Sequence, residues 1–222
     1  MKDGFAVPLA ELSARLAGEQ LDIFGAFHPE PADAAPEDCE TLVLLGPKEP
    51  GFWPRVTASP EFSDGSPDPI DRWSARVISA IAAEFGGIAL FPFGGPPYRP
   101  FVSWARRTGR AWQSPVSLLV HDVAGLMVSY RGAIALPIRF ALPKPPDTSP
   151  CAACHAPCVT ACPADALTGR GYDLDSCHVW LDAPAGKACL NGGCAVRRAC
   201  PISQSYGRLP AQSAYHMGIF HT

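Results

Sequence analysis

Apolar residues follow two kinds of spacing over the first two thirds of the chain. Residues 71–85 carry apolar side chains three to four positions apart, which is typical of a helix with one buried face. The unbroken apolar run at 41–45 predicts a buried strand. The same reasoning predicts a short N-terminal helix within 1–18, a helix at 100–110, and strands at 88–93, 116–121, 126–131 and 133–138. We therefore expect an α+β protein whose first part is a mixed α/β sandwich.

Proline and glycine mark the borders of these elements. Gly86 and Gly87 end the helix at 71–85, and residues 59–69 form a predicted loop. The segment 143–150 holds four prolines and predicts an extended linker. It divides the chain into a first domain at 1–142 and a small domain at 151–206, with a tail at 207–222 that we expect to dock on the body. Large apolar side chains are scarce after the linker, so bound metal is expected to stabilise the small domain.

Charge and hydropathy narrow the choice of partners. The 222 residues have a net charge of −3 and no basic stripe, which gives no reason to expect a nucleic-acid partner. No apolar run is long enough for a membrane helix, and the N-terminal pattern is not that of a signal peptide. We expect a cytoplasmic protein, a compartment in which disulfides are rare.

Eight of the nine cysteines lie between positions 151 and 200. Such crowding in a reducing compartment indicates metal ligation. Two [4Fe–4S] clusters need four thiolates each, and in two-cluster ferredoxins the cysteine before proline crosses to the other cluster. Applied to this sequence, one cluster takes Cys151, Cys154, Cys158 and Cys200, and the other takes Cys162, Cys177, Cys189 and Cys194. The ninth, Cys39, is expected to be a small buried residue.

Other uses of the eight cysteines stay open. They could bind zinc at two sites of four thiolates, hold a single cluster, or form disulfides. Zinc sites favour paired C-x2-C hairpins, and only Cys151 and Cys154 make such a pair. The gaps after Cys154, Cys189 and Cys194 are wider than in a standard ferredoxin.

The stretch from Cys151 to Pro201 resembles the double-cluster module of epoxyqueuosine reductases and reductive dehalogenases. Those proteins also place a lone cysteine in a short helix after the first Cys-Pro pair, and Cys177 in D-L-D-S-C-H-V-W-L has that place. The G-W-x-G-K-N element and the tRNA-binding repeat domain of the reductases are absent from this sequence, so epoxyqueuosine reduction is not expected.

The stretch from Val120 to Pro137 resembles CblC-type cobalamin-processing proteins, whose fold is related to flavin nitroreductases. The resemblance rests on a His, a Gly four residues later, and then Arg-Gly and Leu-Pro. It implies a cofactor pocket, for cobalamin or a flavin, lined by His121, Gly125, Arg131 and Gly132. The stretch from Phe91 to Arg107 lies where that family has a proline- and arginine-rich segment near the pocket, and Gly94 and Gly95 within it could allow the backbone to approach the cofactor closely.

Each of these residues also has a purely structural reading. His121 could be a core histidine, Arg131 could pair with Asp122, and Gly94 with Gly95 could form a plain turn.

Together these resemblances imply an iron–sulfur oxidoreductase. Its two clusters would pass single electrons to a corrinoid or flavin in the first domain, supplied by an electron-donor protein or reductase. A ferredoxin-like carrier for a partner enzyme and a cobalamin chaperone are the alternatives, and a homodimer is possible.

Overall fold

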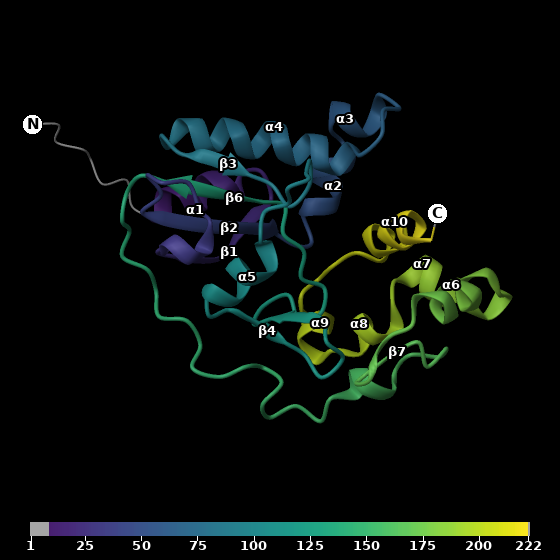
Figure 1. Cartoon of the computed structure of the whole chain (residues 1–222). Coiled ribbons are helices and arrows are strands. Elements are labelled where there is room, and N and C mark those ends of the chain that lie inside the picture. The colour runs from purple at the N-terminus through teal and green to yellow at the C-terminus, as the bar shows by residue number, and fades with distance from the viewer. Residues whose placement is uncertain (1–8, 222) are drawn as a thin grey trace, which may run out of the picture. The chain divides into compact units, whose positions relative to one another are not determined.

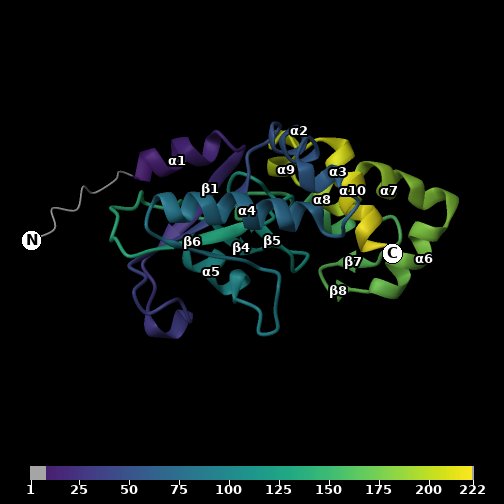
Figure 2. The ribbon, with the colours of Figure 1, turned by 90° about the horizontal axis from the view of Figure 1, so that it is seen from above.

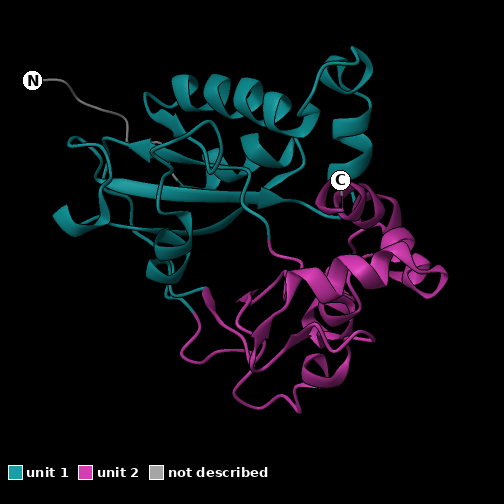
Figure 3. Ribbon diagram, turned by 45° about the vertical axis from the view of Figure 1, so that its right-hand side comes forward, with its two compact units in different colours: residues 1–110, 129–145 teal, residues 111–128, 146–222 magenta. Residues whose placement is uncertain are grey.

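The chain forms two compact units, coloured separately in Figure 3. The computed structural model describes residues 9–221. Unit 1 comprises residues up to 110 together with 129–145, and unit 2 comprises residues 111–128 together with 146 onward. The predicted linker at 143–150 thus contains one passage between the units. The other two passages flank residues 111–128, a segment that the sequence assigned to the first domain.

Unit 1 is built on a four-stranded antiparallel sheet with the order β1-β2-β6-β3 (Figure 1). Its strands are β1 (Leu21–Phe27), β2 (Thr41–Pro47), β3 (Ile88–Leu90) and β6 (Gly132–Leu136). The central strands β2 and β6 pair with Val43 opposite Ile134 and are buried along their whole length. Burial on both faces explains why β2 is an unbroken apolar run rather than an alternating one.

The helices of unit 1 contact the sheet or pack on one another. They are α1 (Leu9–Ala17), α2 (Phe52–Thr57), α3 (Pro60–Ser63), α4 (Pro69–Glu84) and α5 (Phe101–Arg107), and a 3₁₀ turn η1 spans Pro31–Asp33. The longest, α4, begins with a proline, which suits the first helical position, and Gly86 follows its end with a positive φ. Its buried face includes Trp73, Val77 and Ile81, and it lies along β6 and β3 (Figure 2).

Unit 2 is made of short elements. Its strands form two small hairpins, β4 (Ala111–Gln113) with β5 (Leu119–His121), and β7 (Leu167–Thr168) with β8 (Gly171–Tyr172). The helices are α6 (Leu174–Asp182), α7 (Lys187–Gly192), α8 (Ala195–Ala199), α9 (Pro201–Ser205) and α10 (Pro210–Phe220), with 3₁₀ turns η2 (Pro157–Thr160) and η3 (Pro184–Gly186). The apolar core of unit 2 contains two cysteines, Cys158 and Cys200, beside aliphatic side chains.

Several predicted elements are confirmed, among them β2, α4 and the C-terminal part of the N-terminal helix, whose first residues lie outside the described range. The expected strand at 126–131 is wrong. Its backbone is engaged elsewhere: the Met127 amide donates to Ala124 in a turn, and the Arg131 amide donates to Leu45. The strand at 88–93 stops at Leu90, because Pro92 has no amide proton for a ladder. The predicted loop at 59–69 contains α3, and neither β1 nor the hairpin strand β4 was predicted.

At the coarse level the structure is an α+β protein with small antiparallel sheets, as expected. Among residues 9–221, every helix is too short or too polar to span a bilayer.

Candidate functional site

Four of the eight clustered cysteines lie together around the apolar core of unit 2. We call Cys151, Cys154, Cys158 and Cys200 quartet A. Cys158 and Cys200 are buried in that core, and Cys151 packs against it. Electrostatic coupling links the same four thiols, since Cys151, Cys154 and Cys200 all act on the titration of Cys158.

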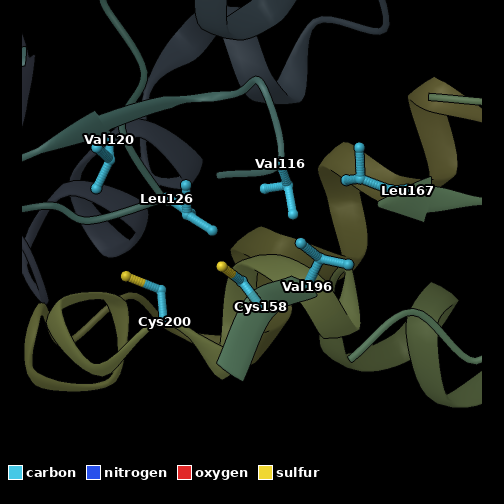
Figure 4. Packing of buried hydrophobic residues seen from close by; sticks show 7 residues of the cluster. All are labelled: Val116, Val120, Leu126, Cys158, Leu167, Val196 and Cys200. Carbon is cyan, nitrogen blue, oxygen red and sulfur yellow. The ribbon is translucent and has the colours of Figure 1, made fainter. Parts of the chain in front are cut away.

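Residues 111–128 supply the other side of this core. Figure 4 shows Val116, Val120 and Leu126 facing Cys158 and Cys200. Two hydrogen bonds stabilise this contact. The Leu126 amide donates to Ser203 Oγ at 2.9 Å, and Arg197 donates to the Leu126 carbonyl. The hairpin segment is therefore part of the cysteine-bearing unit.

The remaining four cysteines line one cavity. We call Cys162, Cys177, Cys189 and Cys194 quartet B. The cavity is small, about 30 Å³, and its other walls are mostly apolar. They include Trp180 and Leu181 of α6, Val196 of α8 and Met217 of α10. The four thiols therefore line one shared space.

Short capped elements position these thiols. Cys177 lies in α6, whose N-cap Asp173 accepts a hydrogen bond from the Ser176 amide at 3.0 Å. Cys189 lies in α7, and Cys194 and Cys200 are the N-cap residues of α8 and α9. Cys200 is extended, as expected for a residue before proline, and Pro201 starts α9. The chain therefore turns at Cys200 as it leaves quartet B for quartet A.

Polar groups that the sequence did not single out lie beside quartet B. Tyr172 Oη donates to Cys177 Sγ at 3.4 Å. Trp180 Nε1 is buried and has no hydrogen-bond partner within the described residues. Arg197 is partly buried and directly follows Val196, a wall of the cavity. Nothing in the spacing of these three residues distinguishes them from ordinary helix and hairpin positions, so only the folded structure reveals them.

Burial disfavours the ionised form of three of these thiols. Burial raises the pKa of Cys151, Cys158 and Cys177, and the neighbouring cysteines of each quartet raise it further. The hydrogen bond from Tyr172 opposes this shift at Cys177. A metal would have to displace these protons to bind. Outside the quartets, Cys39 is half-buried, and burial raises its pKa as well.

Two of the residues expected in a cofactor pocket belong to unit 2. His121 is completely buried, and its Nδ1 accepts hydrogen bonds from the Val123 and Ala124 amides at 3.2 and 3.3 Å. Gly125 pairs with His121 through backbone hydrogen bonds of 2.9 and 3.0 Å. A Cβ on Gly125 would lie 3.0 Å from Cys200 Sγ. Both residues thus shape a turn that packs on quartet A.

The other four belong to unit 1. Arg131 forms an ion pair with Asp71 at 3.2 Å, and Asp122 is not its partner in that pair. Gly132 is packed so that a Cβ would lie 2.9 Å from Ile78 Cδ1 on α4. Gly94 has a positive φ with open space around it, and Gly95 lies in the same turn. The six residues are therefore divided between the units, four and two, and their role in a pocket stays a prediction.

The tail forms α10 within unit 2. This helix packs on α7. Its C-terminal end makes two further contacts: His221 Nε2 lies 3.0 Å from Asp182 Oδ1, and the ring of Phe220 stacks on that of His178. Met217 brings the helix to the cavity of quartet B.

The structure contradicts the function expected from the sequence. Within residues 9–221, no group of three or more His, Cys, Asp or Glu side chains is arranged to hold a metal ion. The prediction of an iron–sulfur redox protein that passes electrons to a corrinoid or flavin is therefore wrong on this structure, and we withdraw it.

Comparison with protein-family models gives no match, and comparisons with curated proteins and with solved structures give no significant match. The resemblances drawn from the sequence remain predictions.

Proposed function

We propose that unit 2 is a cofactor-binding module in which each cysteine quartet accepts one [4Fe–4S] cluster. The observation that carries the proposal is the division of eight thiols into two sets of four, one of which surrounds a single cavity. The proposal concerns binding alone and includes no route for electrons to a corrinoid or flavin.

A cluster and a single ion place different demands on four thiols. One ion draws every sulfur to the same atom, at about 2.3 Å for zinc. In a [4Fe–4S] cluster each thiolate binds a different iron, so the sulfurs stand apart around the cluster. Four thiols that line one cavity suit the second arrangement.

The chemistry of the cavity supports the same guest. Four soft sulfur donors suit iron–sulfur clusters. The buried Trp180 N–H offers a hydrogen bond that no described residue accepts. When bound, a cluster would add metal–thiolate bonds to a unit of short helices and two-residue strands, and such bonds stabilise small domains. All nine cysteines are free thiols, which suits a reducing compartment such as the cytoplasm.

The proposal is tested by anaerobic reconstitution of the full chain with iron and sulfide. We expect brown protein with about eight irons and eight sulfides per chain, four of each per cluster. Cys158→Ser in quartet A and Cys189→Ser in quartet B should each leave about half of the iron. Cys39→Ser is the matched control, because Cys39 lies in unit 1, and it should keep the full amount.

Cys162 and Cys200 test the division itself. Cys162→Ser should give the same loss, and the same remaining spectrum, as Cys189→Ser, whereas Cys200→Ser should resemble Cys158→Ser. Protein that takes up zinc but no iron and sulfide, or that loses iron equally in Cys39→Ser, would refute the proposal.

A further inference from the structure

We propose that Trp180, Tyr172 and Arg197 make the quartet B cavity selective for a negatively charged guest with sulfur acceptor atoms. This inference rests on the proposed function and adds which side chains recognise the cluster in quartet B. It assigns to these residues a role beyond packing, in which they donate hydrogen bonds and positive charge to the guest and to its thiolate ligands.

Trp180 provides the first argument. It lines the cavity, and its Nε1 is buried without a partner among residues 9–221. An indole N–H is only a donor, and leaving such a group buried and unpaired costs free energy. The walls beside it are mainly apolar side chains and cysteine sulfurs. A guest that brings sulfide or thiolate acceptors would remove this cost.

Arg197 provides the second argument. It is partly buried in α8 and directly follows Ala195 and Val196, which line the cavity. Its hydrogen bond goes to a neutral group, the Leu126 carbonyl. The guanidinium forms no ion pair among residues 9–221. A cluster with four thiolate ligands carries net negative charge and would balance it.

Tyr172 provides the third argument. Its hydroxyl donates to Cys177 Sγ at 3.4 Å, and its ring is stacked on Phe220 of α10 with the ring centres 6.2 Å apart. The stacking holds the hydroxyl against one particular ligand. The same hydrogen bond becomes stronger when the sulfur is a thiolate, because bonds to ionised acceptors are stronger than bonds to neutral ones.

These contacts predict a measurable property of the bound cluster. Hydrogen bonds and positive charge near a cluster stabilise its more reduced, more negative state and raise its reduction potential. Quartet A has one backbone donor, since the Ala156 amide donates to Cys154 Sγ at 3.4 Å, and two of its thiols are buried among aliphatic side chains. The two clusters should therefore differ, with the donors acting on quartet B.

The test uses Trp180→Phe and Tyr172→Phe in the reconstituted full chain, each of which removes one donor and keeps an aromatic ring. Trp53→Phe in unit 1 is the matched control. Reduction potentials are measured by EPR-monitored titration, and cluster stability by the rate of iron loss to a chelator. We expect one of the two clusters to shift to a more negative potential and to lose iron several times faster. In the Cys158→Ser background, where quartet B alone is filled, the same shift should appear.

Arg197 is tested by its charge. Because its hydrogen bond also supports the fold, Arg197→Lys is compared with Arg197→Met. Lysine should retain most of the potential of quartet B, and methionine should not.

The outcomes separate the two proposals. If the parent chain holds no cluster in quartet B, the proposed function fails and this inference fails with it. If the parent holds the cluster while Trp180→Phe, Tyr172→Phe and Arg197→Met leave its potential and iron loss unchanged, the proposed function stands and this inference is overturned.

Discussion

Replacement of Gly125 by alanine is the sharpest test of how residues 111–128 pack on the cysteine-bearing part of unit 2. Gly125 has φ +56°, a left-handed conformation. An added Cβ would lie 2.5 Å from the Ser203 amide nitrogen, 2.7 Å from Ser203 Oγ and 3.0 Å from Cys200 Sγ. The nearest of these atoms belongs to the backbone of α9, so no side-chain rotation can relieve that contact.

Two effects set the size of the loss. A left-handed backbone costs an L-residue about 1–2 kcal/mol relative to glycine. Overpacking a well-filled site costs about 1–3 kcal/mol more. We therefore expect Gly125→Ala to destabilise unit 2 by about 2–5 kcal/mol. The displacement of α9 should also weaken the hydrogen bond between the Leu126 amide and Ser203 Oγ, which is 2.9 Å long in the native structure.

Hydrogen exchange of the Leu126 amide is the local assay. Its exchange should accelerate by the factor that corresponds to the lost stability, and chemical denaturation should give the same loss for unit 2. Gly94→Ala is the matched control, because Gly94 has φ +81° but no atom within 4 Å of an added Cβ. Gly94→Ala should therefore lose only the stability that the left-handed backbone costs, about 1–2 kcal/mol, and Gly94 lies in unit 1.

Equal losses in Gly125→Ala and Gly94→Ala would refute the close packing of Gly125 on α9.

Two further variants test other contacts. Ser203→Ala removes the acceptor of the Leu126 amide and should cost about 1–3 kcal/mol, with faster exchange at Leu126; unchanged exchange would mean that water replaces the hydroxyl. In unit 1, the hydrogen bond from Arg76 lowers the pKa of Glu61 to about 2, below its value of roughly 4.3 in an unfolded chain. The pair therefore stabilises the protein above about pH 4.3, and this contribution is lost as the pH falls toward 2. Because Arg76 is exposed, we expect no more than about 1 kcal/mol. Urea unfolding of Arg76→Gln should show a weaker loss of stability over this pH range than the parent, and parallel curves would contradict the pairing.

The spacing of apolar residues was sufficient to predict the helix and the strand that contribute most to the core of unit 1. The helix α4 was predicted because Trp73, Val77 and Ile81 recur at helical spacing, and β2 because its residues are apolar without interruption. Proline and glycine gave the borders, since Gly86 closes α4 and one passage between the units falls in the predicted linker.

Elements decided by tertiary contacts were not predictable in the same way. The run at 126–131 has the composition of a strand, yet its amides bond to a turn carbonyl, to Ser203 and to Leu45. No property of the run itself specifies these partners. For the same reason, the sequence placed residues 111–128 in the first domain, although their apolar side chains complete the core of unit 2.

The cysteine spacing predicted which thiols are neighbours more successfully than it predicted function. Cys-Pro pairs at positions 162 and 200 suggested the exchange of one cysteine between the two sets, and the structure groups the thiols in the same two quartets. Their role as ligands stays a prediction. Spacing carries no information on Trp180 or Arg197, because a donor and a charge acquire meaning only when the fold brings them to a cavity.

The two quartets differ in what supports them without a guest. Cys158 and Cys200 of quartet A are core residues, packed among valine and leucine side chains that would remain in contact if no metal were bound. The thiols of quartet B surround a cavity, and the helices that carry them are short. We therefore expect the part of unit 2 around quartet A, together with residues 111–128, to order first. The region of α6, α7 and α10 should gain more of its stability from a bound guest, because filling a cavity adds contacts that the empty site lacks.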